Sequence, residues 1–447
     1  MSVTVLGGGL AGCEAAWQLA QRGIPVNLYE MKPGKKSPAH HLDTMAELVC
    51  SNSLRSDRLT NAVGLLKAEM RLLGSLIMRV ADETAVPAGG ALAVDRDHFS
   101  EGIDQAIHQH PLITVIPEEV TEIPAEGTVI IATGPLTSDG LSEAIARMQG
   151  LSTLHFYDAA APIVTADSLD TDKIFRMSRY DRGEDYLNCP MTREEYFAFV
   201  HALQTAETAE MHGFEEKAVF EGCMPIESMA KRGDMVIAFG PCKPVGLKDP
   251  RTDKEPFAVV QLRQDNENAT LYNIVGFQTR LRFPEQRRVF GMIPGLENAE
   301  FARYGVMHRN TFLNSPGFLD DTFRVINEPR LSFAGQITGV EGYVESAASG
   351  LLAGLSTAYR EKGQVPPHFS GKTAIGAMGR YVSTSNARFQ PMNCAFGLID
   401  QLEVTPGEKR IRNKQERYAH VAARALDTIE ALRSNPLACD FDKTLKN

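Results

Sequence analysis

The sequence lacks the long apolar runs that membrane-spanning helices need. No stretch of roughly 18 or more apolar residues occurs, which excludes a membrane span of that kind. The start also lacks a basic segment followed by an apolar stretch and a cleavage site, because residues 2–6 lead straight into a glycine-rich turn. We therefore expect a cytoplasmic protein with no membrane partner.

Paired cysteines are also lacking. The chain has 7 cysteines but no Cys-x-x-Cys pair and no Cys/His spacing typical of a metal site. This argues against a disulfide framework and against a structural zinc, and we predict no metal. Each cysteine is then either a packing residue or a reactive thiol. The set is Cys13, Cys50, Cys189, Cys223, Cys242, Cys394 and Cys439.

An excess of positive charge is absent as well. The 46 Lys and Arg residues are outnumbered by 56 Asp and Glu residues, and the net charge of -10 argues against a non-specific nucleic-acid binder. Local basic clusters do occur at residues 280–288, 303–309 and 409–417. Solvated helix faces explain such clusters as well as a ligand would.

The length and composition are those of an ordinary globular protein. At 447 residues with 43% hydrophobic and 23% charged residues, the chain is too long for one compact core. Two domains are the natural expectation, and one of them can be inserted into the other.

A glycine-rich turn near the start is the clearest motif. Residues 2–6 alternate as a β-strand does, and residues 13–20 have a helical pattern. In a Rossmann-type site of this spacing, Gly7 allows a tight turn, Gly9 lets the backbone approach a pyrophosphate, and Gly12 allows close packing of helix on strand. The predicted cofactor-binding residues here are Gly7, Gly8, Gly9, Leu10, Ala11 and Gly12.

An acid follows at the expected distance. A second strand at residues 25–29 ends in Glu30, where a dinucleotide site of this type has an acid that binds ribose hydroxyls. A glycine turn without a ligand is the alternative, and the flanking strand, helix and acid argue against it.

Two further segments indicate FAD rather than NAD. Residues 129–135 are a buried-looking strand with a small-residue turn, similar to the ATG segment near the nucleotide in flavoproteins with two dinucleotide folds. Residues 331–354 are a strand, a glycine loop and a helix rich in small residues, whose N-terminus can approach a flavin or its phosphate. The cofactor-binding residues predicted here are Thr133, Gly134, Gly335, Gly339, Gly342 and Tyr343.

The distance between these glycine segments predicts the domain organisation. Because the closing segment lies far along the chain from the first, the cofactor domain must be split around whatever lies between. We expect residues 1–150 and 305–447 to form a discontinuous α/β FAD-binding domain of Rossmann type. Residues 151–304 are then an inserted α+β domain that receives the substrate or RNA.

Several blocks of sequence, spread over nearly the whole chain, carry a family resemblance. They are AELVCSNSL (46–54), NAVGLLKAEM (61–70), PAGGALAVDR (87–96), YLNCPMT (186–192), GPCKPVGL (240–247) and YGVMHRNT (304–311). These blocks resemble the folate- and FAD-dependent tRNA uracil-5-methyltransferases, the TrmFO (Gid) family. A weaker similarity joins the chain to the larger MnmG (GidA) enzymes, which modify tRNA wobble uridines.

The resemblance implies an activity. It is the methylation of C5 of the T-loop uridine in tRNA, with methylene taken from methylenetetrahydrofolate through reduced FAD and with NADPH, or NADH, as reductant. C5 of uracil becomes nucleophilic only after a group adds to C6, and a thiolate is the usual solution. The resemblance assigns this thiolate to Cys223. It makes Cys50 a second functional thiol, either a general base or a group that captures the methylene.

Packing remains the alternative for every cysteine, because free cysteine is often buried. The neighbours Glu221 and Glu227 disfavour a thiolate at Cys223, so its role depends on the resemblance. Cys50 precedes the polar residues 51–53, which suit an exposed thiol at the end of an element. We expect packing or pocket-lining roles for Cys13, Cys189 and Cys242.

Three other functions stay open. The same chemistry could act on a ribosomal RNA uridine, or the chain could be a flavin oxidoreductase for a small molecule, or a non-catalytic FAD-binding partner. Residues 278–283 interleave arginine with an aromatic residue, which fits either an RNA surface or an edge strand with one solvated face.

Overall fold

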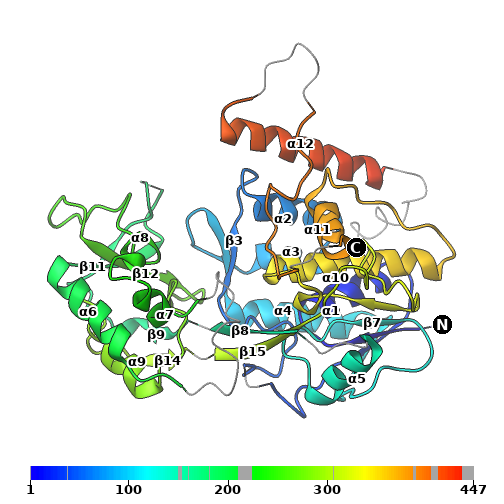
Figure 1. The fold of residues 1–447 in the computed structure, drawn as a ribbon, viewed down its shortest axis with the longest axis horizontal. Helices are drawn as coiled ribbons and strands as arrows, with labels where there is room; N and C mark the ends of the chain where they lie inside the picture. Colours follow the sequence, from blue (N-terminus) through cyan, green and yellow to red (C-terminus); the bar gives the residue numbers. More distant parts are fainter. Residues whose placement is uncertain are drawn as a thin grey trace.

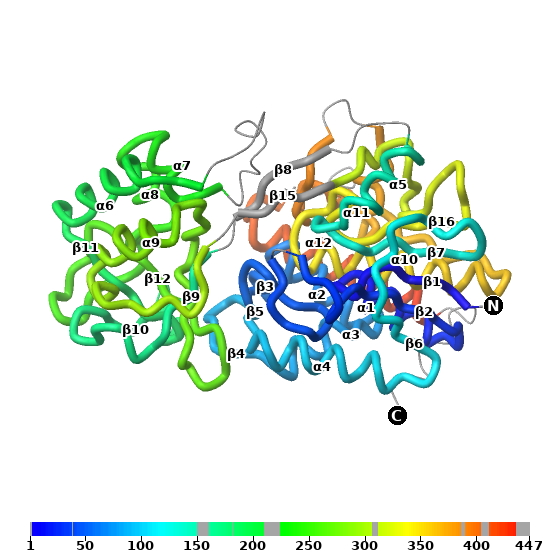
Figure 2. Tube along the Cα trace, turned by 90° about the horizontal axis from the view of Figure 1, so that it is seen from below, coloured from blue at the N-terminus to red at the C-terminus, as the bar shows by residue number. Residues whose placement is uncertain are grey.

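The structure is a computed structural model of the chain. It describes residues 2–37, 39–149, 154–159, 161–180, 182–209, 224–305, 307–385, 389–403 and 411–434. Two bodies of structure lie along its long axis (Figure 1), a larger one on the right and a smaller, green one on the left. Figure 2 shows the same division from below.

A parallel sheet is the centre of the larger body. Its strand order is β16-β7-β1-β2-β6, and every neighbouring pair is parallel. Val, Ile and Leu dominate these strands, as expected where helices cover a parallel sheet. β16 pairs with β7 across a large gap in sequence, so strands from before and after the smaller body complete the sheet. The strands are β1 (Val3–Leu6), β2 (Val26–Tyr29), β6 (Ile113–Ile116), β7 (Val129–Ile131) and β16 (Leu331–Phe333).

Helices α1 (Leu10–Ala20) and α10 (Tyr343–Glu361) pack closely on each other. Glycine permits this approach, since a Cβ at Gly350 would lie 2.1 Å from the Ala11 carbonyl oxygen. The predicted strand, glycine turn and helix are present. The helix begins at Leu10 rather than at residue 13, because Gly9 already has the extended backbone of an N-cap.

The rest of the larger body is mostly helical. Buried Glu69 of α2 accepts hydrogen bonds from the N–H groups of Ala374 and Ile375 at 2.7 and 2.9 Å, which satisfies the start of α11. The helices are α2 (Ala62–Leu72), α3 (Leu76–Glu83), α4 (Arg96–Gln109), α5 (Asp139–Gln149), η4 (Gln336–Thr338), α11 (Ala374–Ser383) and α12 (Lys414–Arg433). A small antiparallel sheet contains β3 (Ser53–Ser56), β4 (Ala85–Val86) and β5 (Ala91–Val94).

The smaller body contains an antiparallel sheet and its own hydrophobic core, which includes Tyr196, Phe199 and Phe277. The strand order is β10-β11-β12-β13-β9-β14. The strands are β9 (Ile163–Thr165), β10 (Phe175–Arg176), β11 (Tyr186–Met191), β12 (Ala258–Gln264), β13 (Leu271–Ile274) and β14 (Phe301–Arg303). The helices are η1 (Ala166–Ser168), α6 (Arg193–Thr205), α7 (Ile226–Lys231), α8 (Val236–Phe239) and α9 (Phe283–Phe290).

A two-stranded antiparallel ribbon, β8 (Leu154–Ala159) with β15 (Met307–Phe312), joins the two bodies. The predicted fold class is confirmed, since a Rossmann-type α/β sheet is interrupted in sequence by an α+β unit. Across the described ranges, no helix combines the length and apolarity that a bilayer crossing demands.

Candidate active site

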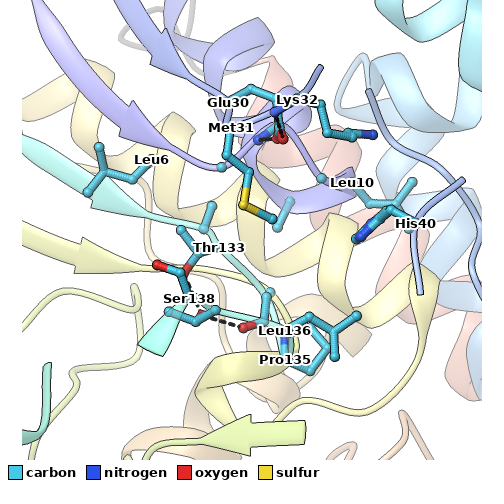
Figure 3. Close-up of a pocket in the computed structure, with 18 of the residues that line it drawn as sticks. Leu6, Leu10, Glu30, Met31, Lys32, His40, Thr133, Pro135, Leu136 and Ser138 are labelled. Carbon is cyan, nitrogen blue, oxygen red and sulfur yellow. Dashed lines mark hydrogen bonds between the residues drawn. The ribbon is translucent and has the colours of Figure 1, made fainter. Parts of the chain in front are cut away.

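A cavity opens where the strands of the parallel sheet end (Figure 3). Its empty volume, which includes solvent space at the open mouth, is about 1090 Å³. Ligands of open parallel sheets bind at this edge, because the loops after the strands converge there. The predicted residues that line it are Gly7, Gly8, Gly9, Leu10, Ala11, Glu30, Thr133, Gly134, Gly335 and Tyr343.

The remaining predicted glycines lie away from the cavity wall. A Cβ at Gly12 would be 1.8 Å from the Gly7 carbonyl oxygen, so Gly12 permits the packing of α1 on the turn. A Cβ at Gly339 would meet the ring of Phe389 at 2.4 Å. A Cβ at Gly342 would meet the carboxylate of Glu345 at 2.5 Å. These three glycines therefore have packing roles in the structure.

Gly9 is different, because open space lies above it. No atom lies within 4 Å of the position that a Cβ at Gly9 would occupy. Gly9 is also the N-cap of α1, whose first turn has no acidic side chain. Backbone N–H groups at a helix start attract anions. The room above Gly9 and these N–H groups together fit the pyrophosphate of a dinucleotide such as FAD.

Glu30 lies beside Gly8 of the same glycine turn. Its carboxylate accepts hydrogen bonds from the N–H of Gly8 at 2.6 Å and of Lys32 at 3.0 Å. A carboxylate has about four acceptor positions, so capacity remains for ribose hydroxyls. In Figure 3, Glu30 and Lys32 lie across the cavity from Thr133 and Ser138.

Several lining residues were not predicted from the sequence. Some of them directly follow the carboxyl end of a strand, and the others lie on loops that return to the same edge of the sheet. Those that follow a strand could have been predicted, because ligands of parallel sheets bind at the carboxyl ends of the strands. These residues include Met31, Lys32, His40, Glu47, Val49, Glu118, Glu119, Leu136, Thr137 and Ser138.

Cys50 is half-buried beside Tyr343, at the side of the cavity that Glu47 and Val49 line. The Cys50 N–H donates a hydrogen bond to the Tyr343 hydroxyl at 2.6 Å, and the Ser51 N–H donates to the same oxygen at 3.3 Å. Burial raises the pKa of Tyr343, so its hydroxyl stays neutral near pH 7. The backbone at Cys50 is thus fixed against a residue of the cofactor cavity.

Two buried arginines from different bodies hold the same loop. Arg263 of β12 donates to the Ser51 hydroxyl at 2.6 Å and to the Asn52 side-chain oxygen at 3.0 Å. Arg96 donates to the carbonyl of Leu48, and it pairs with buried Asp265 at 3.0 Å. Both arginines interact electrostatically with Cys50. Cations close to a thiol favour its thiolate form, so this setting suits a reactive cysteine.

Replacement of Arg263 by glutamine tests this positioning role. We expect the pH midpoint for alkylation of Cys50 to rise and methyl transfer to fall roughly tenfold or more, because the loop loses a cation and a hydrogen bond. Peptide mass spectrometry after iodoacetamide treatment of the apoprotein measures the midpoint. Arg251→Gln, which removes a partly exposed ion pair with Asp249, is the matched control. An unchanged midpoint in Arg263→Gln would contradict the role.

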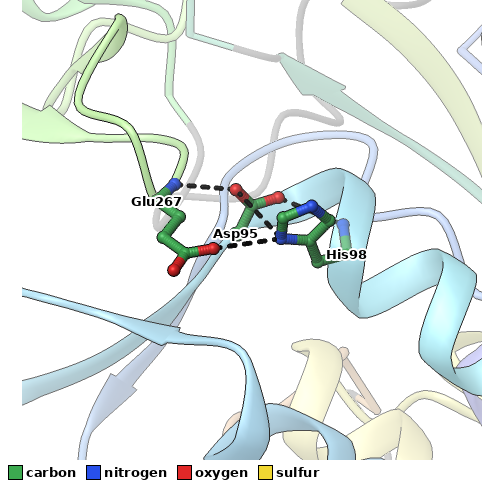
Figure 4. A group of neighbouring side chains, drawn as sticks. All are labelled: Asp95, His98 and Glu267. Atoms are coloured by element: carbon green, nitrogen blue, oxygen red, sulfur yellow. Dashed lines mark hydrogen bonds and ion pairs between the residues drawn. The ribbon is translucent and has the colours of Figure 1, made fainter.

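Asp95, His98 and Glu267 form a cluster with the residue types of a cation site (Figure 4). One Asp95 oxygen already accepts the N–H groups of Asp97 and His98 at the start of α4, and the other accepts the Glu267 N–H at 2.7 Å. His98 lies 3.4 Å from the Glu267 carboxylate. The cluster therefore caps a helix and joins the two bodies near the Cys50 loop.

Cys223 lies outside the described residues, and so does Cys439. The chain on both sides of the segment 210–223 is described. The Ala209 N–H bonds to the Arg280 carbonyl at 2.8 Å, and the Ile226 N–H bonds to the Gln278 carbonyl at 2.8 Å. Both ends of this segment are thus held by one short stretch of chain. The cysteines that are buried in hydrophobic cores are Cys13, Cys189, Cys242 and Cys394.

Comparison with known proteins places the chain among tRNA-modifying flavoproteins. The family model described as glucose inhibited division protein A matches residues 2–364. The methylenetetrahydrofolate–tRNA-(uracil-5-)-methyltransferase TrmFO of Lactobacillus gasseri is 59% identical over 434 residues, covering 97% of this chain and 98% of that protein. The TrmFO of Enterococcus faecalis is 60% identical over 427 residues, covering 95% and 97%.

The solved structures support the fold. Aquifex aeolicus GidA, in its form II crystal, superposes with a TM-score of 0.70 at 17% identity, covering 99% of this chain and 75% of that chain. With whole-chain identity near 60% to several TrmFO proteins, the chain belongs to the TrmFO family, within the wider group of glucose inhibited division protein A.

Proposed function

We infer that the protein methylates C5 of a uridine in tRNA, with methylenetetrahydrofolate as the one-carbon donor and FAD as the bound cofactor. The observation that carries this conclusion is 59% identity to a named methyltransferase of this type over 97% of the chain. The cavity above the glycine turn supports it, because open space above Gly9 at a helix start, with Glu30 nearby, suits a dinucleotide.

Different residues around the cavity would bind different parts of FAD. The open backbone at Gly9 and the start of α1 would hold the pyrophosphate, and Glu30 would bind the ribose. Thr133, Gly335 and Tyr343 would line the remainder. When bound, FAD supplies transfer of the one-carbon unit and of reducing equivalents from NADPH or NADH.

Cys223 is the proposed nucleophile. Its thiolate adds to C6 of uracil, and the new S–C6 bond places electron density on C5, which can then accept the one-carbon unit. The C5 proton then leaves, the one-carbon unit gains a hydride that derives from NADPH or NADH, and cleavage of the S–C6 bond restores the aromatic pyrimidine. Cys50, in the cationic setting of Arg96 and Arg263, would take that proton or capture the one-carbon unit.

The RNA partner is proposed to be the T-loop of tRNA in the cytoplasm. Residues 1–150 with 305–447 would bind the cofactor, and residues 151–304 would bind RNA and carry Cys223 to the flavin. The target base must be unstacked, which costs a few kcal/mol that contacts in the site have to offset.

Incubation of the purified protein with unmodified tRNA transcript, methylenetetrahydrofolate and NADPH tests the function. We expect 5-methyluridine at the T-loop position, detected by mass spectrometry of nuclease fragments. Product on a ribosomal RNA transcript alone would favour ribosomal RNA as the substrate. Oxidation of NADPH without product on either RNA would favour a small-molecule oxidoreductase, and a flavin that NADPH does not reduce would favour a non-catalytic partner.

A further inference from the structure

An aromatic stack runs from the core of the smaller body to its surface. The rings of Phe283 and Tyr304 stack with centroids 4.5 Å apart and an interplanar angle of 18°. Tyr304 stacks in turn on Phe301 at 5.1 Å and 9°, and Phe301 meets the buried ring of Phe290. The outer ring, Phe283, is 49% exposed. An exposed aromatic ring offers a face on which a nucleic-acid base can stack.

A buried glutamine fixes the two outer rings relative to each other. The Gln286 amide donates to the carbonyl oxygens of Leu281 and Gly305 at 2.7 Å each, and its oxygen accepts from the Gly305 N–H at 2.8 Å. These bonds join the chain before Phe283 to the chain after Tyr304. The stack is therefore preorganised, so ordering its side chains would reduce the free energy of ligand binding only slightly.

Two contacts connect the stack to the reaction site. The residues before it, Gln278 and Arg280, hold both ends of the segment that carries Cys223. Arg303, next to Tyr304, donates a hydrogen bond to the Ala39 carbonyl at 3.1 Å. His40, which follows Ala39, lines the cofactor cavity. The stack is thus connected in sequence to residues that contact Ala209 and Ile226 on one side and the cavity loop on the other.

Arginines are concentrated beside the stack, and one of them has no carboxylate partner among the described residues. Residues 278–290 contain four arginines and one glutamate, in a chain whose net charge is -10. Arg280 lies 3.8 Å from the carboxylate of buried Glu227. Arg282 and Arg288 are half-exposed and pair with Glu207 and Glu285. The guanidinium of Arg287 lies 5.3 Å above the Tyr304 ring and bonds to its hydroxyl, with no carboxylate partner among the described residues. An acidic protein that binds RNA needs such a local basic surface.

We propose that Phe283 and Tyr304, with Arg282 and Arg287, form a platform on which an unstacked base of the tRNA lies while the target uridine reaches Cys223. The base stacks on the exposed face of Phe283, and Arg287 contacts a neighbouring phosphate. This inference rests on the proposed function, because it assumes an RNA substrate for the same site.

Binding of unmodified tRNA transcript to the FAD-loaded enzyme, followed by fluorescence anisotropy, tests the platform. Phe283→Ala is expected to weaken binding roughly 5- to 100-fold, as loss of one stacked base does. Phe283→Trp keeps a stacking face and should bind within a few-fold of wild type. Arg287→Gln should reduce the slope of log Kd against log salt concentration by about 1. The reduction of bound flavin by NADPH, measured without RNA, should not change in any variant.

Phe239→Ala is the matched control, because Phe239 is an exposed aromatic residue of the same body on α8, distant from α9 in Figure 1. It should bind tRNA as wild type does. Equal RNA affinity of Phe283→Ala and wild type would overturn the platform, as would a raised KM for methylenetetrahydrofolate with unchanged RNA affinity, which would assign the stack to folate. A wild type that binds tRNA without methylating it would contradict the proposed function alone, and weaker binding by Phe283→Ala would still support the platform.

Discussion

Replacement of Cys223 by alanine is expected to abolish methyl transfer to tRNA while FAD stays bound and reducible. Without the sulfur, nothing adds to C6 of uracil and C5 remains unreactive. Loss of a covalent nucleophile costs on the order of 10³-fold or more in rate. Single-turnover formation of 5-methyluridine measures the loss, and flavin absorbance with NADPH confirms that the cofactor site is intact.

A covalent trap separates nucleophilic catalysis from a structural role. Wild-type protein should form a denaturation-resistant complex with tRNA that contains 5-fluorouridine, because fluorine blocks the loss of the C5 substituent. Cys223→Ala should form none, and Cys439→Ala, for which no role is assigned, should behave as wild type. Normal turnover by Cys223→Ala would refute the assignment.

Gly9→Ala is expected to bind FAD at least about tenfold more weakly, equivalent to about 1.4 kcal/mol, in a protein that still folds. The added methyl group would enter the open space above Gly9, where the pyrophosphate is proposed to lie, and it would touch no protein atom within 4 Å. Flavin retained after dialysis, together with the melting temperature of the apoprotein, separates binding from folding.

Two other glycines provide the controls. Gly12→Ala places a Cβ 1.8 Å from the Gly7 carbonyl oxygen and should destabilise the apoprotein itself. Gly397→Ala also has no atom within 4 Å of the new Cβ and does not line the cavity, so it should retain FAD. Full FAD affinity in Gly9→Ala would show that the pyrophosphate does not lie above this turn.

The cofactor half of the fold was predictable because its signals are local. A strand, a glycine turn, a helix and an acid such as Glu30 follow one another within a short stretch, and each has a distinct pattern. Because the glycine segment that includes Gly335 lies far along the chain from this turn, the cofactor domain was predicted to be split. The local pattern could not show which role each glycine has. A Cβ at Gly12 or Gly342 would meet protein atoms, whereas Gly9 faces the cavity.

The surroundings of Cys50 could not be predicted in the same way. Tyr343 lies 293 residues from Cys50 in sequence, and Arg263 lies 211 residues from Asn52. Nothing in the local sequence of a buried arginine in a strand distinguishes it from an exposed one. The Tyr343 contact arises only when α10 packs within the larger body, and the Arg263 contact only when the smaller body packs against the larger one.

The source of the methyl group tests the central claim most directly. Wild-type protein is incubated with unmodified tRNA transcript, NADPH and methylenetetrahydrofolate that carries deuterium on its methylene carbon. We predict a T-loop 5-methyluridine that retains both deuterium atoms, because the methylene passes intact to C5 and only a hydride is added. An unlabelled methyl group, or product that requires S-adenosylmethionine instead of folate, would contradict the account.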